Sequence, residues 1–160
     1  MFDHLKTYDV GQAKSWLEMP ELGSNARLLL NPATEANKPY YNAMLKLSGK
    51  RARNLARNGT ISVEDLQKNR DEDRILYPKY VIAGWECVET EEDREREDED
   101  KEYIEYNMDV ASELCRKLPP HLFDRVRNHA ATPEQFYPDD EMPPVAEELA
   151  ENSKSDSSSN

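Results

Sequence analysis

Three histidines and two cysteines are the residues of this 160-residue sequence best suited to metal binding or nucleophilic catalysis. His4, His121 and His129 share no metal-ligand spacing, and the two cysteines form no C-x-x-C pair and complete no set with them. A structural zinc site would need an unusual arrangement, so we interpret the histidines as surface residues. We interpret Cys87 and Cys115 as reduced thiols, and Cys115, which lies on a helical apolar pattern, as part of the core.

The glycines and the many carboxylates give no further catalytic or nucleotide-binding motif. The glycines lie at positions 11, 23, 49, 59 and 84, so the chain has no G-x-G-x-x-G and no P-loop that could cradle a phosphate. The carboxylates are densest where water would keep their pKa values ordinary, whereas general acid–base catalysis needs a perturbed group in a cleft. We therefore predict that the protein is not an enzyme and needs no metal or other cofactor.

The net charge of -12 comes from two segments of the chain. Residues 86–105 contain 12 acidic and three basic residues, and residues 139–160 contain seven acidic residues and one lysine. Such dense like charge repels itself and buries little surface, so we predict a solvated acidic loop at about 89–102 and a disordered acidic, Ser-rich tail over 138–160. The basic segment 46–57 could suggest nucleic acid, but the negative chain repels phosphate, and pairing with the protein's own acidic loop costs less. No nucleic-acid partner is expected.

Composition limits the size of the core and the setting of the protein. With 37% hydrophobic and 34% charged residues, the chain can build one domain with a modest core, which we place over residues 1–137. No run approaches the roughly 18 apolar residues of a membrane span, and the first ten residues lack the features of a signal peptide. We therefore expect a soluble intracellular protein without a membrane partner.

The elements of this domain can be predicted from turn formers and apolar spacing. Two apolar runs within residues 16–30 flank the turn-forming PELGSN, which predicts a small β-hairpin or two extended segments. Apolar residues recur at three- and four-residue steps over 39–57, which predicts an amphipathic helix that ends near Gly59. Ser62 with Asp65 resembles a capping box that opens the next helix.

The most apolar stretch is YPKYVIAGWECV, residues 77–88, which directly precedes the acidic loop. Pro78 removes a hydrogen-bond donor, so we expect it to bend or restart the helix. Residues of one face, among them Trp85, predict a second short helix at the centre of the core. After the loop, YIEY at residues 103–106 predicts a short returning strand.

Two more helices complete the predicted fold. DVASELCRKL, with Asp109 as its N-cap, predicts one helix, and PHLFDRVRNHA at 120–130 predicts the last. The sequence thus predicts a mostly helical α+β domain: a small N-terminal β-hairpin or extended segments, then four to five helices, then the disordered tail.

Several segments in this order resemble a known family. NARLLLNPATEANKPYYNAMLKL, then ILYPKYVIAGWECV, a charged insertion, and NMDVASELCRKLPPHLFDRVRNHA are similar to the tail assembly chaperones of long-tailed bacteriophages over roughly residues 26–130. In that family a GWEGV-like stretch precedes a variable linker, an N-A-x-x-L-L-x-x-L-P helix and an LFD helix. The chain departs from the pattern in two ways: Cys87 stands where glycine is common, and the 89–102 linker is longer and more acidic.

The resemblance implies a late phage protein that is not an enzyme. Such chaperones bind the tape measure protein in the host cell cytoplasm, keep it soluble during tail tube polymerisation and are absent from the mature virion. The major tail protein and further copies of the chain are additional partners that the resemblance suggests. Five residues were selected as candidate client contacts: Tyr40, Tyr41, Leu122, Phe123 and Val126. Tyr40, Tyr41, Leu122 and Phe123 are equally well explained as core.

Two other functions remain open on the sequence alone. One is a structural minor tail or head–tail joining protein, which would be present in the virion. The other is an acidic inhibitor that mimics DNA, which needs carboxylates on rigid elements at phosphate-like spacing.

Overall fold

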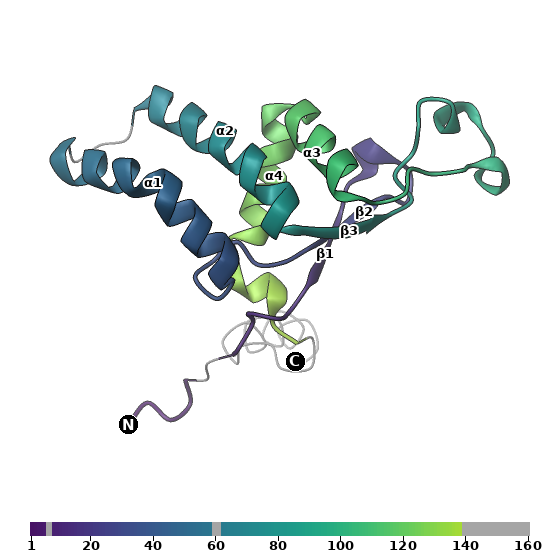
Figure 1. Ribbon diagram of the computed structural model, residues 1–160. Coiled ribbons are helices and arrows are strands. Elements are labelled where there is room, and N and C mark those ends of the chain that lie inside the picture. The colour runs from purple at the N-terminus through teal and green to yellow at the C-terminus, as the bar shows by residue number, and fades with distance from the viewer. Residues whose placement is uncertain (6–7, 59–61, 139–160) are drawn as a thin grey trace, which may run out of the picture.

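The computed structural model describes residues 1–5, 8–58 and 62–138, and Figure 1 shows their arrangement. The helices and strands in these residues are, in chain order, β1 (Ser15–Glu18), β2 (Arg27–Leu30), α1 (Lys38–Asn58), α2 (Val63–Tyr80), β3 (Ile82–Glu86), α3 (Met108–Lys117) and α4 (Pro120–Ala130). The predicted mostly helical α+β fold with a small N-terminal hairpin is confirmed. The disorder predicted for the tail stays a prediction, because residues 139–160 lie outside the described part of the chain.

The sheet is antiparallel in the order β1-β2-β3, and its two faces differ in burial. On one face Leu28 of β2 pairs with Trp85 of β3, and both side chains are buried. On the other face Trp16 of β1 pairs with Leu29, is 37% exposed, and lies under the Arg27 guanidinium at 3.9 Å from the ring centre. One face therefore packs against the rest of the domain, while the other meets solvent, as is common for antiparallel sheets.

The prediction of a short helix over residues 77–88 is wrong. α2 continues through Pro78 as far as Tyr80, and the apolar run then becomes β3. The helix ends where the carbonyl of Val81 accepts the backbone N–H of Asn31 at 2.7 Å, which turns the chain into the sheet. A short apolar run suits a buried strand as well as a buried helix, and pairing with the distant β2 decides between them.

The strand predicted at 103–106 is also absent from the structure. Single hydrogen bonds hold this segment beside β3. The N–H of Ile104 donates to the carbonyl of Val88 at 2.7 Å, and the Tyr106 hydroxyl donates to the carbonyl of Ile82 at 3.0 Å. The Trp85 indole donates to the Ile104 carbonyl at 2.8 Å. One backbone bond and two side-chain bonds therefore hold this segment beside β3 without a strand ladder.

The helix starts agree largely with the sequence. Ser62 and Asp65 form the predicted capping box of α2. α3 begins earlier than predicted, because the side chain of Asn107, and not that of Asp109, accepts the N–H of Val110 at 2.9 Å.

The core is centred on α2. Tyr77 lies edge-on to Tyr40 of α1 and to Phe123 of α4, with ring centroids 5.8 and 5.4 Å apart. A bidentate pair, Arg70 with Asp124 at 3.0 to 3.1 Å, also joins α2 to α4. Figure 1 shows that the far ends of α1 and α2 project from one end of the molecule and that residues 89–102 project from the opposite end. Among the described helices, none is both long and apolar enough to cross a membrane.

Candidate protein-binding site

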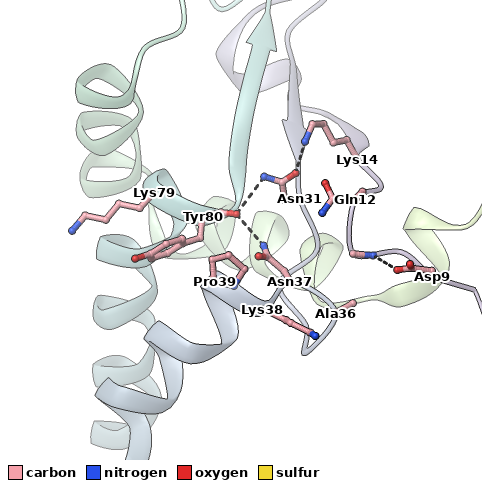
Figure 2. A pocket seen from close by; sticks show the side chains of 11 residues that line it. Asp9, Gln12, Lys14, Asn31, Ala36, Asn37, Lys38, Pro39, Lys79 and Tyr80 are labelled. Atoms are coloured by element: carbon pink, nitrogen blue, oxygen red, sulfur yellow. Dashed lines mark hydrogen bonds between the residues drawn. The ribbon is translucent and has the colours of Figure 1, made fainter.

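A polar hollow of about 660 Å³ lies where the segment after β2 meets the start of α1 (Figure 2). Its polar groups bind one another: the Asn37 amide donates to the Tyr80 carbonyl at 3.0 Å, the Asn31 amide donates to the same carbonyl at 3.3 Å, and Lys14 donates to Asn31 at 2.9 Å. These bonds join the end of α2 to the start of α1. We therefore assign the hollow to the fold. In the described residues, no group of three or more His, Cys, Asp and Glu side chains could hold a metal ion.

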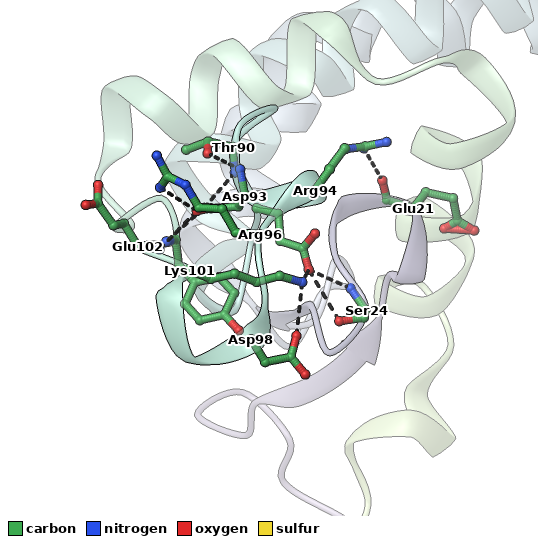
Figure 3. Close-up of polar contacts among 11 residues, drawn as sticks. Glu21, Ser24, Thr90, Asp93, Arg94, Arg96, Asp98, Lys101 and Glu102 are labelled. Atoms are coloured by element: carbon green, nitrogen blue, oxygen red, sulfur yellow. Dashed lines mark hydrogen bonds and ion pairs between the residues drawn. The ribbon is translucent and has the colours of Figure 1, made fainter.

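The acidic loop, residues 89–102, is organised around one fully buried carboxylate, Asp93 (Figure 3). Asp93 accepts the backbone N–H groups of Glu102 and Tyr103 at 3.0 Å each and that of Thr90 at 3.1 Å. The backbone N–H of Asp93 donates to the Thr90 hydroxyl at 3.0 Å. The Arg96 guanidinium donates to the Asp93 carboxylate at 3.3 Å. These bonds tie the start of the loop to its end.

The same bonds keep Asp93 charged despite its burial. The N–H of Glu102 favours the carboxylate most, the Thr90 and Tyr103 donors add to it, and together they lower the pKa of Asp93 to about 2 against the opposing effect of burial. A carboxylate that accepts several N–H bonds is the expected anchor for a loop without an apolar core.

A buried ion pair, Lys101 with Glu89, joins the acidic loop to the β1–β2 turn. Lys101 donates to Glu89 at 2.8 Å, and both side chains are almost fully buried. Glu89 also accepts the N–H of Ser24 at 2.9 Å, and its own N–H donates to the carbonyl of Leu22 at 2.8 Å. The Glu89 hydrogen bond raises the pKa of Lys101, and Lys101 lowers the pKa of Glu89, so both remain charged near neutral pH.

The chain enters and leaves the loop through two left-handed residues, Cys87 at φ 58° and Tyr103 at φ 50°. A left-handed residue turns the chain sharply, which allows both ends of the loop to lie beside β3. Glycine would adopt this conformation at position 87 without steric cost. At Gly23 a Cβ atom would come within 2.5 Å of the Cys87 carbonyl oxygen, so the turn also depends on glycine.

The loop holds most of its acidic side chains in solvent. Seven Glu and Asp residues are exposed besides Glu102: Glu91, Glu92, Glu95, Glu97, Asp98, Glu99 and Asp100. The residues predicted as a solvated loop thus form an ordered projection with a carboxylate-rich surface.

An apolar pocket of about 210 Å³ lies directly beside the acidic loop. Its lining includes Val88 and Ile104, which stand next to the two left-handed residues, together with Trp85 of β3 and Val110 and Leu114 of α3. The pocket also borders Glu113 and Lys117, which pair with each other at 2.7 Å. Most of the lining residues are apolar, while the projection next to the pocket is strongly acidic.

The candidate contacts selected from the sequence lie elsewhere. Tyr40, Leu122, Phe123 and Val126 are buried in the core, and Tyr41 is half-buried. Phe123 is fully enclosed, with the Arg74 guanidinium 4.9 Å from its ring centre. These four buried side chains are not available to a partner in this conformation.

Sequence reasoning missed the pocket because its residues come from three separate segments. Trp85 was predicted as core, which is confirmed, and Val110 was placed on the apolar side of its helix. The available signal was the position of the acidic insertion, which begins and ends at pocket residues. Local patterns do not show that Val88 and Ile104 meet α3.

Comparison with known proteins identifies the family. Residues 35–142 match the family model described as YdaY prophage protein, a region that includes α1 to α4, β3, the acidic loop and the pocket. The chain is therefore a phage-associated protein. It belongs to the YdaY prophage protein family. No curated protein and no solved structure matches the chain.

Proposed function

We propose that this protein is a tail assembly chaperone of a long-tailed phage, which binds a segment of the tape measure protein in the host cytoplasm and is absent from the mature virion. Membership of a prophage family and the order of the GWECV, NMDVASELCRKLPP and LFD segments support a phage assembly role. The observation that carries the binding function is the apolar pocket beside the fixed acidic loop.

This arrangement suits an amphipathic helix with basic residues near an apolar anchor. One large apolar side chain of the client enters the pocket, and the hydrophobic effect supplies affinity there. Lys and Arg residues of the client face the loop, which speeds encounter and selects against acidic segments. Because Asp93 and the Lys101–Glu89 pair already fix the loop, little ordering entropy is lost on binding.

The acidic loop also explains how a complex with an apolar client stays soluble. Residues 89–102 contain ten acidic and three basic residues, so the complex carries a highly charged projection beside the occupied pocket. Like-charged complexes repel one another. In this proposal Tyr40, Leu122, Phe123 and Val126 support the domain from within, and the pocket makes the direct contacts.

The proposal is tested by co-expression with the tape measure protein and a charge placed in the pocket. Val110 is half-buried against the core and is the third residue of α3, where glutamate suits a helix start, and a thermal melt checks that Val110→Glu folds. We expect this variant to lose client binding by about tenfold or more, because a desolvated carboxylate replaces an apolar contact. Ser112→Glu, on the same helix but outside the pocket lining, is the matched control and should bind as the wild type does.

Equal recovery of client with Val110→Glu and with wild-type protein would refute the pocket as the client site. Mass spectrometry of purified particles tests the role itself. Stoichiometric presence in mature virions would replace the chaperone with a structural tail or head–tail joining protein.

A second candidate, an acidic DNA mimic that inhibits a host DNA-binding enzyme, is supported by the fixed display of exposed carboxylates on the loop. Duplex DNA would displace the target enzyme from this protein, and binding of the target would not change in Val110→Glu. Reversal of loop charges should abolish inhibition, whereas a chaperone would lose part of its affinity and keep its pocket contact.

A further inference from the structure

One ridge of α1 has the features of a docking surface. Leu45, Gly49 and Arg53 are four residues apart and so follow one another along the helix. Leu45 is 48% exposed, and Arg53 is exposed as well. A Cβ atom at Gly49 would meet nothing within 4 Å among the described residues, so packing against them does not require glycine there. Glycine weakens a helix interior, and its usual benefit is the close approach of another backbone.

The charge of α1 is opposite to that of the acidic loop. α1 contains six Lys and Arg residues and no Asp or Glu, whereas residues 89–102 carry a net charge of -7. Figure 1 shows α1 extending toward one end of the molecule and the loop at the other. The interpretation that the basic segment pairs with the loop of its own chain is therefore wrong for the described residues of one molecule. The two surfaces can meet between molecules.

We propose that α1 of a second copy docks on the apolar pocket and the acidic loop. Leu45 enters the pocket between Trp85 and α3, Gly49 lets the α1 backbone lie close to the pocket rim, and Arg53 faces the exposed carboxylates. This inference goes beyond the proposed function and does not depend on it, because only the two complementary surfaces of this chain are used.

Such a contact joins two different surfaces, so a pair keeps one free α1 on one molecule and one free pocket on the other. Association therefore continues head to tail, into an open chain or a closed ring. If a client helix uses the same pocket, it competes with α1, and client binding releases monomers from the assembly.

Sedimentation velocity of the full-length protein tests the contact. At about 50 mM salt the mean mass should rise with concentration beyond that of a dimer, and at about 500 mM salt it should fall, because screening weakens contacts between exposed charges. Two variants each remove one surface: Gly49→Gln on α1, and the triple substitution Glu95→Lys, Glu97→Lys and Glu99→Lys on the loop. Each should weaken self-association by about tenfold or more.

Two further measurements separate docking from a structural role. Gly49→Gln should raise the unfolding temperature while it weakens association, because glutamine is the better helix former and nothing in the described structure obstructs it. When the two variants are mixed in equal amounts, the intact α1 of the loop variant should bind the intact pocket of the Gly49→Gln variant. The mixture should form a dimer that grows no further.

A wild-type protein that stays monomeric at low salt would overturn the proposal. Unchanged association of Gly49→Gln, or a mixture that forms no dimer, would also overturn it. Client recovery by Val110→Glu is measured separately, so failure of this contact and failure of the chaperone function are distinguishable.

Discussion

The acidic loop and the α1–α2 pair project from opposite ends of the molecule (Figure 1). The burial of side chains in each differs from what its amino-acid composition predicts. The loop is almost entirely charged, yet it buries Asp93 and most of the Lys101–Glu89 pair. The two helices have regular hydrogen bonding, yet they expose Leu45, Leu66 and other large apolar residues.

The difference shows that order and burial have separate physical causes. The loop is ordered by donors and acceptors that satisfy one another across its base, which requires no apolar surface. The helices are ordered by their backbone and by packing at the end nearest the domain, and side chains such as Leu45 and Leu66 remain exposed. Charge therefore does not imply disorder here, and an apolar side chain does not imply core. An exposed apolar surface on a regular element is a usual mark of an interface.

The largest expected effect tests what supports the loop. Trp85→Ala should lower the free energy of unfolding by about 3 to 5 kcal/mol, because it leaves a cavity and removes the indole bond to the Ile104 carbonyl. Trp16→Ala on the open sheet face is the matched control and should cost about 1 kcal/mol or less. Urea melts of both variants give the comparison. Equal losses would mean that the two faces of the sheet are not as different as the structure shows.

The second prediction concerns acid. The pKa of Asp93 is lowered from an ordinary 3.8 to about 2, so the bonds of the charged form stabilise the loop fully above pH 3.8. This stability is lost as the pH falls from 3.8 through 2. NMR should show the amide signals of Glu102 and Tyr103 moving with a midpoint near 2.

Asp93→Asn should reproduce the acid state at neutral pH, since an amide presents one acceptor oxygen to donors that now use two. Trypsin should then cut after Arg94 and Arg96 at least about tenfold faster than in the wild-type protein. Glu97→Gln, an exposed carboxylate of the same loop, is the control. Equal cleavage of the two variants would show that the loop does not depend on Asp93.

The sequence predicts the elements whose signals are local and misses those decided by distant partners. The hairpin, α1 and the capping box of α2 follow from turn formers, spacing and side-chain chemistry within a few residues. β3 could not be predicted, because only pairing with Leu28 and Leu29 distinguishes it from a buried helix. The order of the loop rests on bonds from Asp93 to residues nine and ten positions further on, which no local pattern encodes.

The candidate site was harder to predict than the fold, for the same reason. Burial of Phe123 and Val126 follows from the apolar face of α4, but the sequence could not decide whether that face meets the core or a partner. The pocket depends on Val88 and Ile104, which the acidic loop separates in the chain and the fold brings together beside α3.

A smaller effect is expected at the entrance to the loop. Cys87→Gly should raise the free energy of unfolding by about 1 kcal/mol, because glycine removes the steric cost of a left-handed residue at φ 58°. Cys87→Ala keeps the Cβ atom and should leave stability within about 0.5 kcal/mol of the wild-type value. Thermal melts of both variants separate the steric cost of the left-handed backbone from the loss of the thiol side chain. A glycine variant no more stable than the alanine variant would mean that the entrance to the loop is not strained.

The smallest effect is expected on the exposed surface of the helix pair. Leu66 and Leu76 lie on the same helix, α2, but Leu66 is 52% exposed and Leu76 only 5% exposed. Leu76→Ala should cost about 2 to 4 kcal/mol because it leaves a cavity, whereas Leu66→Ala should change the free energy of unfolding by no more than about 0.5 kcal/mol. Alanine is at least as good a helix former as leucine, so backbone propensity does not obscure the difference. If chemical denaturation shows Leu66→Ala to be as costly as Leu76→Ala, the outer surface of α2 is packed in solution. The contrast between an ordered acidic loop and an exposed apolar helix surface would then hold for the loop alone.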